Sequence, residues 1–555
     1  MAWGDGGSLR SCDALLKRVE ENDPALSELV ILPMKIFGPL DVDRLSSAIG
    51  EECVQKCVKM NIRVTRDLHF VCVDDILATT SCYAMANAAI NIHSATRVLH
   101  RSTASGANTH LHSISASGHN LPPESLKRLA LALSTQAKMI LQGGKDKICG
   151  ITSIAIGSKD MCDKGVIALC EGLEESNGGL LQVIDFGWKN LICIPDKLRI
   201  AVHTIGRGKD GLHAIGKTFS SSKYLTQLDL SRNNNIGSDG IACLVEAAKE
   251  HAGNEVVAFP SLEKLILSEC NIGPPGMHSL AEIFLGINVN RCKPIDLAIN
   301  SNPIGSEGCE TLAKITAMSG RGSMLSCLYL SQCAIGDEGV KLLSNAATSN
   351  TCSGLTFLDL SENSITSDGV RVFAGSLVDS WPSLVELKLA KNDLSGEGVT
   401  SLMGSLSTRS DGAIDDAANT KNQSLQKLDL TCTGCGKDGA IAALSSASLT
   451  SLRLFNNRLG SEGFRSISAF LQGGHPSIEN LDLGGNNADE DSVVKLLNAI
   501  ADKIDDGASS KLSVLEIGGN KFGAKAMEAL TKLKQVWPRL DVAHDKPIQD
   551  ADEDE

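Results

Sequence analysis

Aromatic side chains are scarce in this chain, and so are the segments that would direct it to a membrane. Phe, Trp and Tyr make up 3% of the 555 residues, which is low for a globular enzyme and natural for a core of stacked Leu and Ile. No run of about 18 apolar residues is present, and the opening MAWGDGGSLRSCD lacks the apolar segment of a signal peptide. We therefore expect a cytoplasmic protein, or one in or around the nucleus, without membrane contact.

Basic residues are fewer than acidic ones, with 52 Lys and Arg against 66 Asp and Glu, which gives a net charge of −14. Nucleic acids and anionic membranes attract basic surfaces, so neither is expected as a partner. The motifs GxSxG and HExxH are absent from the sequence. These absences favour a monomeric, non-enzymatic protein that needs no cofactor or metal and binds a basic partner or none.

What the sequence does contain is one pattern repeated along most of its length. Residues 355–377, LTFLDLSENSITSDGVRVFAGSL, alternate like a strand at Leu358 and Leu360 and then take helical spacing at Val370 and Phe373. Each copy predicts a strand, a turn and a helix, which must stack on its neighbours to bury its apolar faces. About 14 copies can be aligned, beginning at Leu26, Leu111, Ile151, Leu181, Leu225, Leu262, Pro294, Leu325, Leu355, Leu384, Leu425, Leu449, Ile478 and Leu512.

Stacking such units predicts an α/β solenoid in the form of a horseshoe. Parallel strands lie about 4.8 Å apart and helices about 10 Å apart, so the parallel sheet forms the concave side and the helices the convex side. We expect an N-terminal helical cap at 1–25, the solenoid at 26–543 and an acidic disordered tail at 544–555. Residues 51–106 and 192–207 break the spacing, so they are expected to be insertions, either surface loops or translated sequence that the mature protein lacks.

An asparagine recurs eight residues after the start of many copies, and its expected role is to hydrogen-bond the backbone of the turn. These asparagines are Asn233, Asn302, Asn363, Asn392, Asn457, Asn486 and Asn520. Cys270 and Cys333 take the same position, and Cys435 takes an apolar one, which favours buried thiols over disulfides.

Three short motifs suggest cofactor or metal sites, but the repeats account for them better. Gly206, Gly208 and Gly211 form a GxGxxG, with Asp229 at the end of the following strand, as in a dinucleotide site. However, Gly211 and Asp229 both occupy regular repeat positions. The CxxC at Cys432 lies in the turn of one repeat without a second CxxC, and the histidines near residue 112 occupy positions that face different directions.

The residues free to meet a partner are those between the buried aliphatics of each strand, because they point to the concave side. Tyr329 and Phe357 come from adjacent repeats and are expected to form one apolar patch rimmed by charges, as an interface anchor does. An alternative stays open, in which LDLS is simply the commonest filling of a repeat strand. The predicted partner-binding residues are Asp229, Lys264, Tyr329, Phe357, Asp359, Glu386, Lys388, Asp429, Arg453 and Asp482.

The repeat LxxLxLxxNxIxxxGxxxLxxxL resembles that of leucine-rich-repeat proteins of the ribonuclease-inhibitor-like subclass, from about Leu26 to Val542. This resemblance implies a scaffold that binds a protein partner on its concave face. The sequence LRLFNNRLG at 452–460, followed by an acidic C-terminus, is also similar to the GTPase-activating protein of the small GTPase Ran. That second resemblance implies a GTPase partner whose catalytic glutamine is ordered by Asn456.

Overall fold

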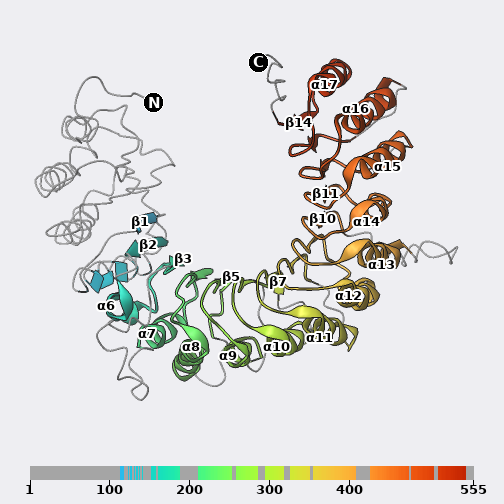
Figure 1. The fold of residues 1–555 in the computed structure, drawn as a ribbon. Coiled ribbons are helices and arrows are strands. Elements are labelled where there is room, and N and C mark those ends of the chain that lie inside the picture. Colours follow the sequence, from blue (N-terminus) through green and yellow to red (C-terminus); the bar gives the residue numbers. More distant parts are fainter. Residues whose placement is uncertain are drawn as a thin grey trace, which may run out of the picture. The chain divides into compact units, whose positions relative to one another are not determined.

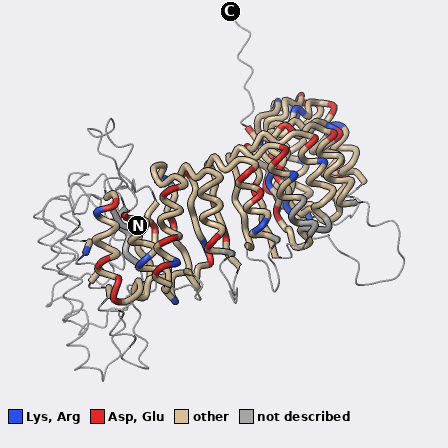
Figure 2. Tube along the Cα trace, turned by 90° about the horizontal axis from the view of Figure 1, so that it is seen from below, with Lys and Arg blue, Asp and Glu red and all other residues tan. Residues whose placement is uncertain are grey.

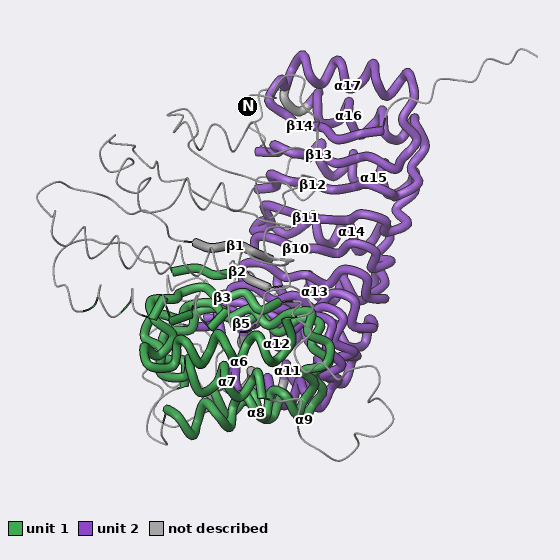
Figure 3. Tube along the Cα trace, turned by 90° about the vertical axis from the view of Figure 1, so that its left-hand side faces the viewer, with its two compact units in different colours: residues 1–293 green, residues 294–555 purple. Residues whose placement is uncertain are grey.

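The computed structural model forms two compact units, residues 1–293 and 294–555, which are described separately (Figure 3). The expected cap at 1–25, the weak repeat at Leu26, the insertions 51–106 and 192–207, and residues 546–555 of the tail lie outside the described residues. The structure describes 113–117, isolated positions between 123 and 141, 152–157, 161–187, 210–252, 258–285, 294–317, 325–349, 354–407, 425–473, 477–505 and 511–545.

In the first unit, parallel strands follow one another in chain order with helices between them (Figure 1). The strands are β1 (Ser113–Ser117), β2 (Ser153–Gly157), β3 (Val183–Asp185), β4 (Gln227–Asp229) and β5 (Lys264–Ile266). The helices are α6 (Cys162–Leu173), the short 3-10 helix η1 (Glu174–Ser176), α7 (Asp210–Phe219), α8 (Gly237–Ala252) and α9 (Pro274–Leu285).

The second unit continues the same alternation, with its strands on the inner side of an arc and its helices on the outer side (Figure 1). The strands are β6 (Ile295–Ala298), β7 (Leu325–Tyr329), β8 (Phe357–Asp359), β9 (Glu386–Lys388), β10 (Lys427–Asp429), β11 (Ser451–Arg453), β12 (Asn480–Asp482), β13 (Val514–Glu516) and β14 (Asp541–Ala543). The helices are α10 (Gly305–Ala317), α11 (Gly336–Ser349), α12 (Ser367–Ser380), α13 (Ser395–Ser407), α14 (Gly436–Leu444), α15 (Gly460–Gln472), α16 (Glu490–Asp505) and α17 (Ala524–Val536).

The predicted α/β solenoid of parallel strands and covering helices is confirmed in both units. Each strand except the last coincides with the start of a repeat, and β14 follows the repeat that begins at Leu512. The core is formed by the aliphatic positions of the repeat, as Leu358, Leu360 and Phe373 show by being no more than 1% exposed. Burial of one such side chain contributes about 1.5–3 kcal/mol, so each repeat is held chiefly by contact with its neighbours.

The seven recurring asparagines form a buried ladder that links each turn to the preceding repeat. Asn486 is typical: its Nδ2 donates to the carbonyl oxygens of Leu454 and Leu483 at 2.8 and 2.9 Å. Its Oδ1 accepts from the backbone N–H groups of Asn457 and Leu459. The side chain therefore satisfies backbone groups that the buried turn would otherwise leave without partners. Asn233, Asn302, Asn363, Asn392, Asn457 and Asn520 likewise donate to backbone carbonyls.

The cysteines in repeat positions are buried thiols, as predicted. The Sγ of Cys270 donates to the Leu230 carbonyl at 3.1 Å, and that of Cys333 to the Ile299 carbonyl at 3.3 Å, in place of an asparagine amide. Burial raises the pKa of both thiols, and of Cys435, to about 12. None of the nine cysteines in the described residues is assigned to a disulfide bond. Reactive thiolate chemistry is therefore not expected at these three positions.

Within the described ranges, no cluster of His, Cys, Asp and Glu could hold a metal ion. Of the helices that the structure describes, none is long and apolar enough to cross a membrane. Charges of both signs are interspersed along the helices (Figure 2). Many of them pair between neighbouring helices, as Lys437 does with Glu462 at 2.6 Å and Arg371 with Glu397 at 2.8 Å.

Candidate protein-binding surface

Two side chains of each three-residue strand point away from the core, so the sheet of the second unit carries two parallel rows of outward-facing residues. Strand register places Tyr329 beside Asp359, then Lys388, Asp429 and Arg453 in order along one row. The same row continues through Asp482, Glu516 and Ala543. Phe357, Glu386 and Lys427 lie in the other row.

Eight of the ten predicted partner-binding residues therefore share one sheet face in residues 294–545. The other two, Asp229 and Lys264, lie on the neighbouring strands β4 and β5 of the first unit. Partner binding by any of the ten stays a prediction.

Tyr329 and Phe357 form an aromatic pair on β7 and β8. Their ring centroids lie 4.5 Å apart with the planes tilted by 36°, which is a favourable geometry for two aromatic rings. The Lys388 Nζ lies 5.0 Å from the Phe357 ring centroid, within the range of a cation–π contact. Burial, and then negative charge nearby that includes Asp296, raises the pKa of the Tyr329 hydroxyl. This half-buried hydroxyl therefore stays protonated and can donate a hydrogen bond at neutral pH.

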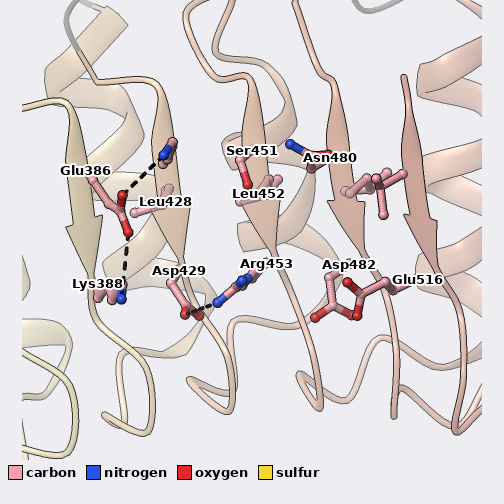
Figure 4. Close-up of a pocket in the computed structure, with 13 residues that line it drawn as sticks. Glu386, Lys388, Leu428, Asp429, Ser451, Leu452, Arg453, Asn480, Asp482 and Glu516 are labelled. Carbon is pink, nitrogen blue, oxygen red and sulfur yellow. Dashed lines mark ion pairs between the residues drawn. The ribbon is translucent and has the colours of Figure 1, made fainter. Parts of the chain in front are cut away.

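Strands β9, β10 and β11 carry charges that compensate one another (Figure 4). Glu386 lies 3.7 Å from the Lys388 Nζ and 3.5 Å from the Lys427 Nζ. On the adjacent strands, a terminal nitrogen of Arg453 lies 3.6 Å from Asp429 Oδ2. These three strands form the paired segment of the sheet face.

Strands β12, β13 and β14 differ, because their outward positions carry three carboxylates and no lysine or arginine. These carboxylates belong to Asp482, Glu516 and Asp541, and we call the three strands the acidic segment. Figure 4 shows Asp482 and Glu516 side by side, in agreement with their strand register. Burial raises the pKa of Asp482, and the charge of Glu516 adds to the rise against the opposing effects of the Gly484 N–H and Arg453.

The two segments together line an open hollow of about 390 Å³ that extends from β9 to β13. Charged side chains of both rows line it, together with the strand centres at Leu428, Leu452 and Leu481, whose side chains are no more than 2% exposed.

Sequence reasoning missed a structural role for the strand aspartates. Asp229, Asp359, Asp429 and Asp482 each accept, at 2.9 Å, a hydrogen bond from the backbone N–H two residues further on. This Asx-type turn ends the strand and explains part of the LDLS preference without any partner. The recurrence of Asp two residues before Ser, Thr or Gly was the signal available in the sequence. It also accounts for Asp229, which had suggested a dinucleotide site.

Asn456 lies at the turn that follows β11, and its side chain is exposed. Its backbone takes the left-handed conformation with φ of 53°, as the corresponding residue does in most repeats. Its Nδ2 donates to the Cys432 Sγ at 3.3 Å. Sulfur is a weak acceptor, so this amide keeps most of its capacity to bind another group.

A family model described as Leucine Rich repeat matches residues 221–245, 260–281, 323–344, 351–374, 382–403, 421–442 and 445–468. The NACHT, LRR and PYD domains-containing protein 5 of Homo sapiens is 26% identical over 332 residues, which cover 59% of this chain and 25% of the relative. The ribonuclease inhibitor of Sus scrofa is 25% identical over 312 residues, 52% of this chain and 65% of the relative. The ribonuclease inhibitor of Mus musculus is 23% identical over 412 residues, 70% of this chain and 85% of the relative.

Proposed function

Because this chain is a leucine-rich-repeat protein of the ribonuclease-inhibitor-like class, we propose that it is a non-catalytic scaffold that binds a partner protein. The partner lies against the sheet face of residues 294–545. The observation that carries the proposal is the aromatic pair, since packed aromatic rings among charged residues are typical of an interface anchor. The relative named ribonuclease inhibitor inhibits a ribonuclease, which supports a protein partner here.

The scaffold proposal is tested by removing the aromatic pair. Partner proteins are captured from extract with wild type, with a Tyr329→Ala, Phe357→Ala double variant, and with a Val372→Ala control. Val372 is an exposed apolar residue on α12, 39% accessible to solvent. The double variant should bind the purified partner at least about tenfold more weakly, as loss of an interface anchor does. Hydrogen exchange should show protection of β7 and β8 in the complex. Equal affinity of all three proteins contradicts the proposal.

A second candidate function is activation of a Ran-like small GTPase, and the exposed amide of Asn456 is the observation that favours it. The amide would orient the catalytic glutamine of the GTPase. Single-turnover GTP hydrolysis by Ran tests this candidate with wild type, Asn456→Ala and Asn487→Ala. Asn487 is a matched control, exposed and also left-handed with φ of 56°. Strong acceleration that only Asn456→Ala loses supports activation, and no acceleration by wild type refutes it.

A further inference from the structure

The acidic segment lacks a positive charge of its own within the described residues. Neither Asp482 nor Glu516 takes part in an ion pair there. Arg453, on the strand beside Asp482, lies 3.6 Å from Asp429, and it lowers the pKa of Asp482 less than burial raises it. The half-buried carboxylate of Asp482 and the exposed carboxylate of Glu516 lie on adjacent strands and repel each other, and a cation from outside would relieve this repulsion. The hollow of about 390 Å³ leaves room for such a group.

An exposed aromatic ring lies near one of these carboxylates, that of Asp482. Phe455, the residue before Asn456, is 42% exposed, although most large apolar side chains in the described residues are buried. Its ring packs on Gly484 and Gly485: a Cβ added at Gly484 would lie 2.9 Å from the ring and 3.2 Å from Asp482 Oδ1. The ring and the carboxylate therefore flank the same glycine. Any larger residue at 484 would displace one of them.

These groups match the chemistry of one side chain. A guanidinium is planar, donates two parallel hydrogen bonds to carboxylates and stacks on aromatic faces. A lysine ammonium is a compact point charge that stacks less well on a ring. The half-buried Val514, which lines the same hollow, would contact the aliphatic stem of an arginine.

We propose that Phe455, Asp482 and Glu516 form a clamp for an arginine side chain in a basic segment of the partner protein. This inference rests on the proposed scaffold function and names the chemistry of the partner. The clamp binds by ion pairing and stacking and performs no covalent step.

The experiment uses a fluorescein-labelled peptide with four arginines among glycines and serines, together with matched peptides that carry lysine or citrulline. Fluorescence anisotropy gives the affinity of the full chain for each peptide. Wild type is compared with an Asp482→Asn, Glu516→Gln double variant and with Phe455→Leu. The control is an Asp438→Asn, Glu307→Gln double variant, which removes the same charge from exposed positions on α14 and α10.

Wild type should prefer arginine over lysine by about threefold or more and should not bind the citrulline peptide measurably. The carboxylate variant should bind the arginine peptide about tenfold more weakly than the control variant does. The Phe455→Leu variant should bind the arginine peptide about threefold more weakly than wild type, and it should no longer prefer the arginine peptide over the lysine peptide. Equal losses in the carboxylate and control variants, or equal affinities for arginine and lysine in wild type, overturn the clamp.

The captured partner separates failure of the clamp from failure of the scaffold. A partner that is lost with the aromatic-pair variant but kept by the carboxylate variant refutes the clamp alone. A partner that tolerates both variants refutes the sheet face as the binding surface, and with it the proposed function.

Discussion

The paired segment, β9–β11, and the acidic segment, β12–β14, share one backbone repeat and one leucine core, yet their outward surfaces differ. In the paired segment, Glu386 and Asp429 have cations within 4 Å. In the acidic segment, Asp482 and Glu516 have none in the part of the chain that the structure describes. Because only two side chains per strand are free of the core, a change of partner chemistry can be made there without a change of fold.

The largest expected effect concerns two buried turns, one after β12 in the acidic segment and one after β10 in the paired segment, whose side chains at the asparagine position make different numbers of hydrogen bonds. Asn486→Ala in the acidic segment removes an amide that donates to the carbonyls of Leu454 and Leu483. It also removes the acceptor of two backbone N–H groups. Thr433 holds the equivalent position in the paired segment, and its hydroxyl donates to the Leu430 carbonyl at 2.8 Å.

Asn486→Ala should therefore lower the free energy of unfolding by about 3 kcal/mol and Thr433→Ala by about 1 kcal/mol. Urea unfolding measures both. Hydrogen exchange should show loosening in the repeats on either side of residue 486, because stability passes between neighbours. Equal costs for the two substitutions would mean that the turns are not distinguished by their hydrogen bonds.

The second prediction converts one segment into the other. Arg453→Gln removes the cation that accompanies Asp429, so that the unpaired carboxylates extend from β12 back to β10. The variant should bind the arginine peptide about threefold more tightly and change stability by less than about 1 kcal/mol, as expected for an exposed ion pair. Arg465→Gln on α15 makes the same charge change away from the sheet face. If both variants gain the same affinity for the arginine peptide, the net charge of the chain sets the affinity, and the local surface does not.

The smallest expected effect is a pH dependence that belongs to the acidic segment. The pKa of Asp482 in the folded chain is raised above its usual 3.8, so the folded state holds this proton at a pH where the unfolded chain has lost it. The free energy of unfolding therefore falls as pH rises from about 3.8 through the raised pKa. Asp482→Asn should be more stable than wild type at pH 7, by less than about 1 kcal/mol, and equal to it below pH 3.

Asp489 provides the control of opposite sign. Hydrogen bonds from Ser461 and Ser492 lower its pKa from 3.8 to about 2. The ionised Asp489 therefore stabilises the folded state above pH 3.8, and this stabilisation is lost as pH falls towards 2. Asp489→Asn should therefore be less stable than wild type at pH 7, and the difference should shrink in acid. Chemical unfolding between pH 2.5 and 7 measures both variants, and a shared direction would contradict the assignment.

The fold could be predicted from the sequence because leucines such as Leu358 and Leu360 recur at fixed positions and have only one way to be buried together. The same period of two placed Tyr329 and Phe357 on one face, and the rings do pack together. Phe455 was not predicted, because the equivalent position in other repeats holds small residues such as Thr431 and its exposure depends on the glycines of the next repeat.

Glu516 was not among the predicted partner-binding residues, although it lies in the same row as Asp482. Its importance depends on what faces it: Asp482 on one adjacent strand, and the uncharged Ala543 on the other. The lack of a compensating charge beside Glu516 depends on three repeats at once, and its effect depends on the burial of Asp482. The turn bonds made by the strand aspartates were missed for a related reason, since they depend on the backbone directions after each strand.

The row of one outward side chain per strand has a regular spacing of about 4.8 Å, the distance between adjacent strands. An extended peptide lying across the strands repeats its facing side chains about every 6.7 Å, so it loses register within two steps. A helix advances about 5.4 Å per turn and drifts by only about 0.6 Å at each strand. From Asp429 to Glu516 the row counts three such steps. Over that distance a helical segment can keep one side chain opposite each strand, and an extended segment cannot.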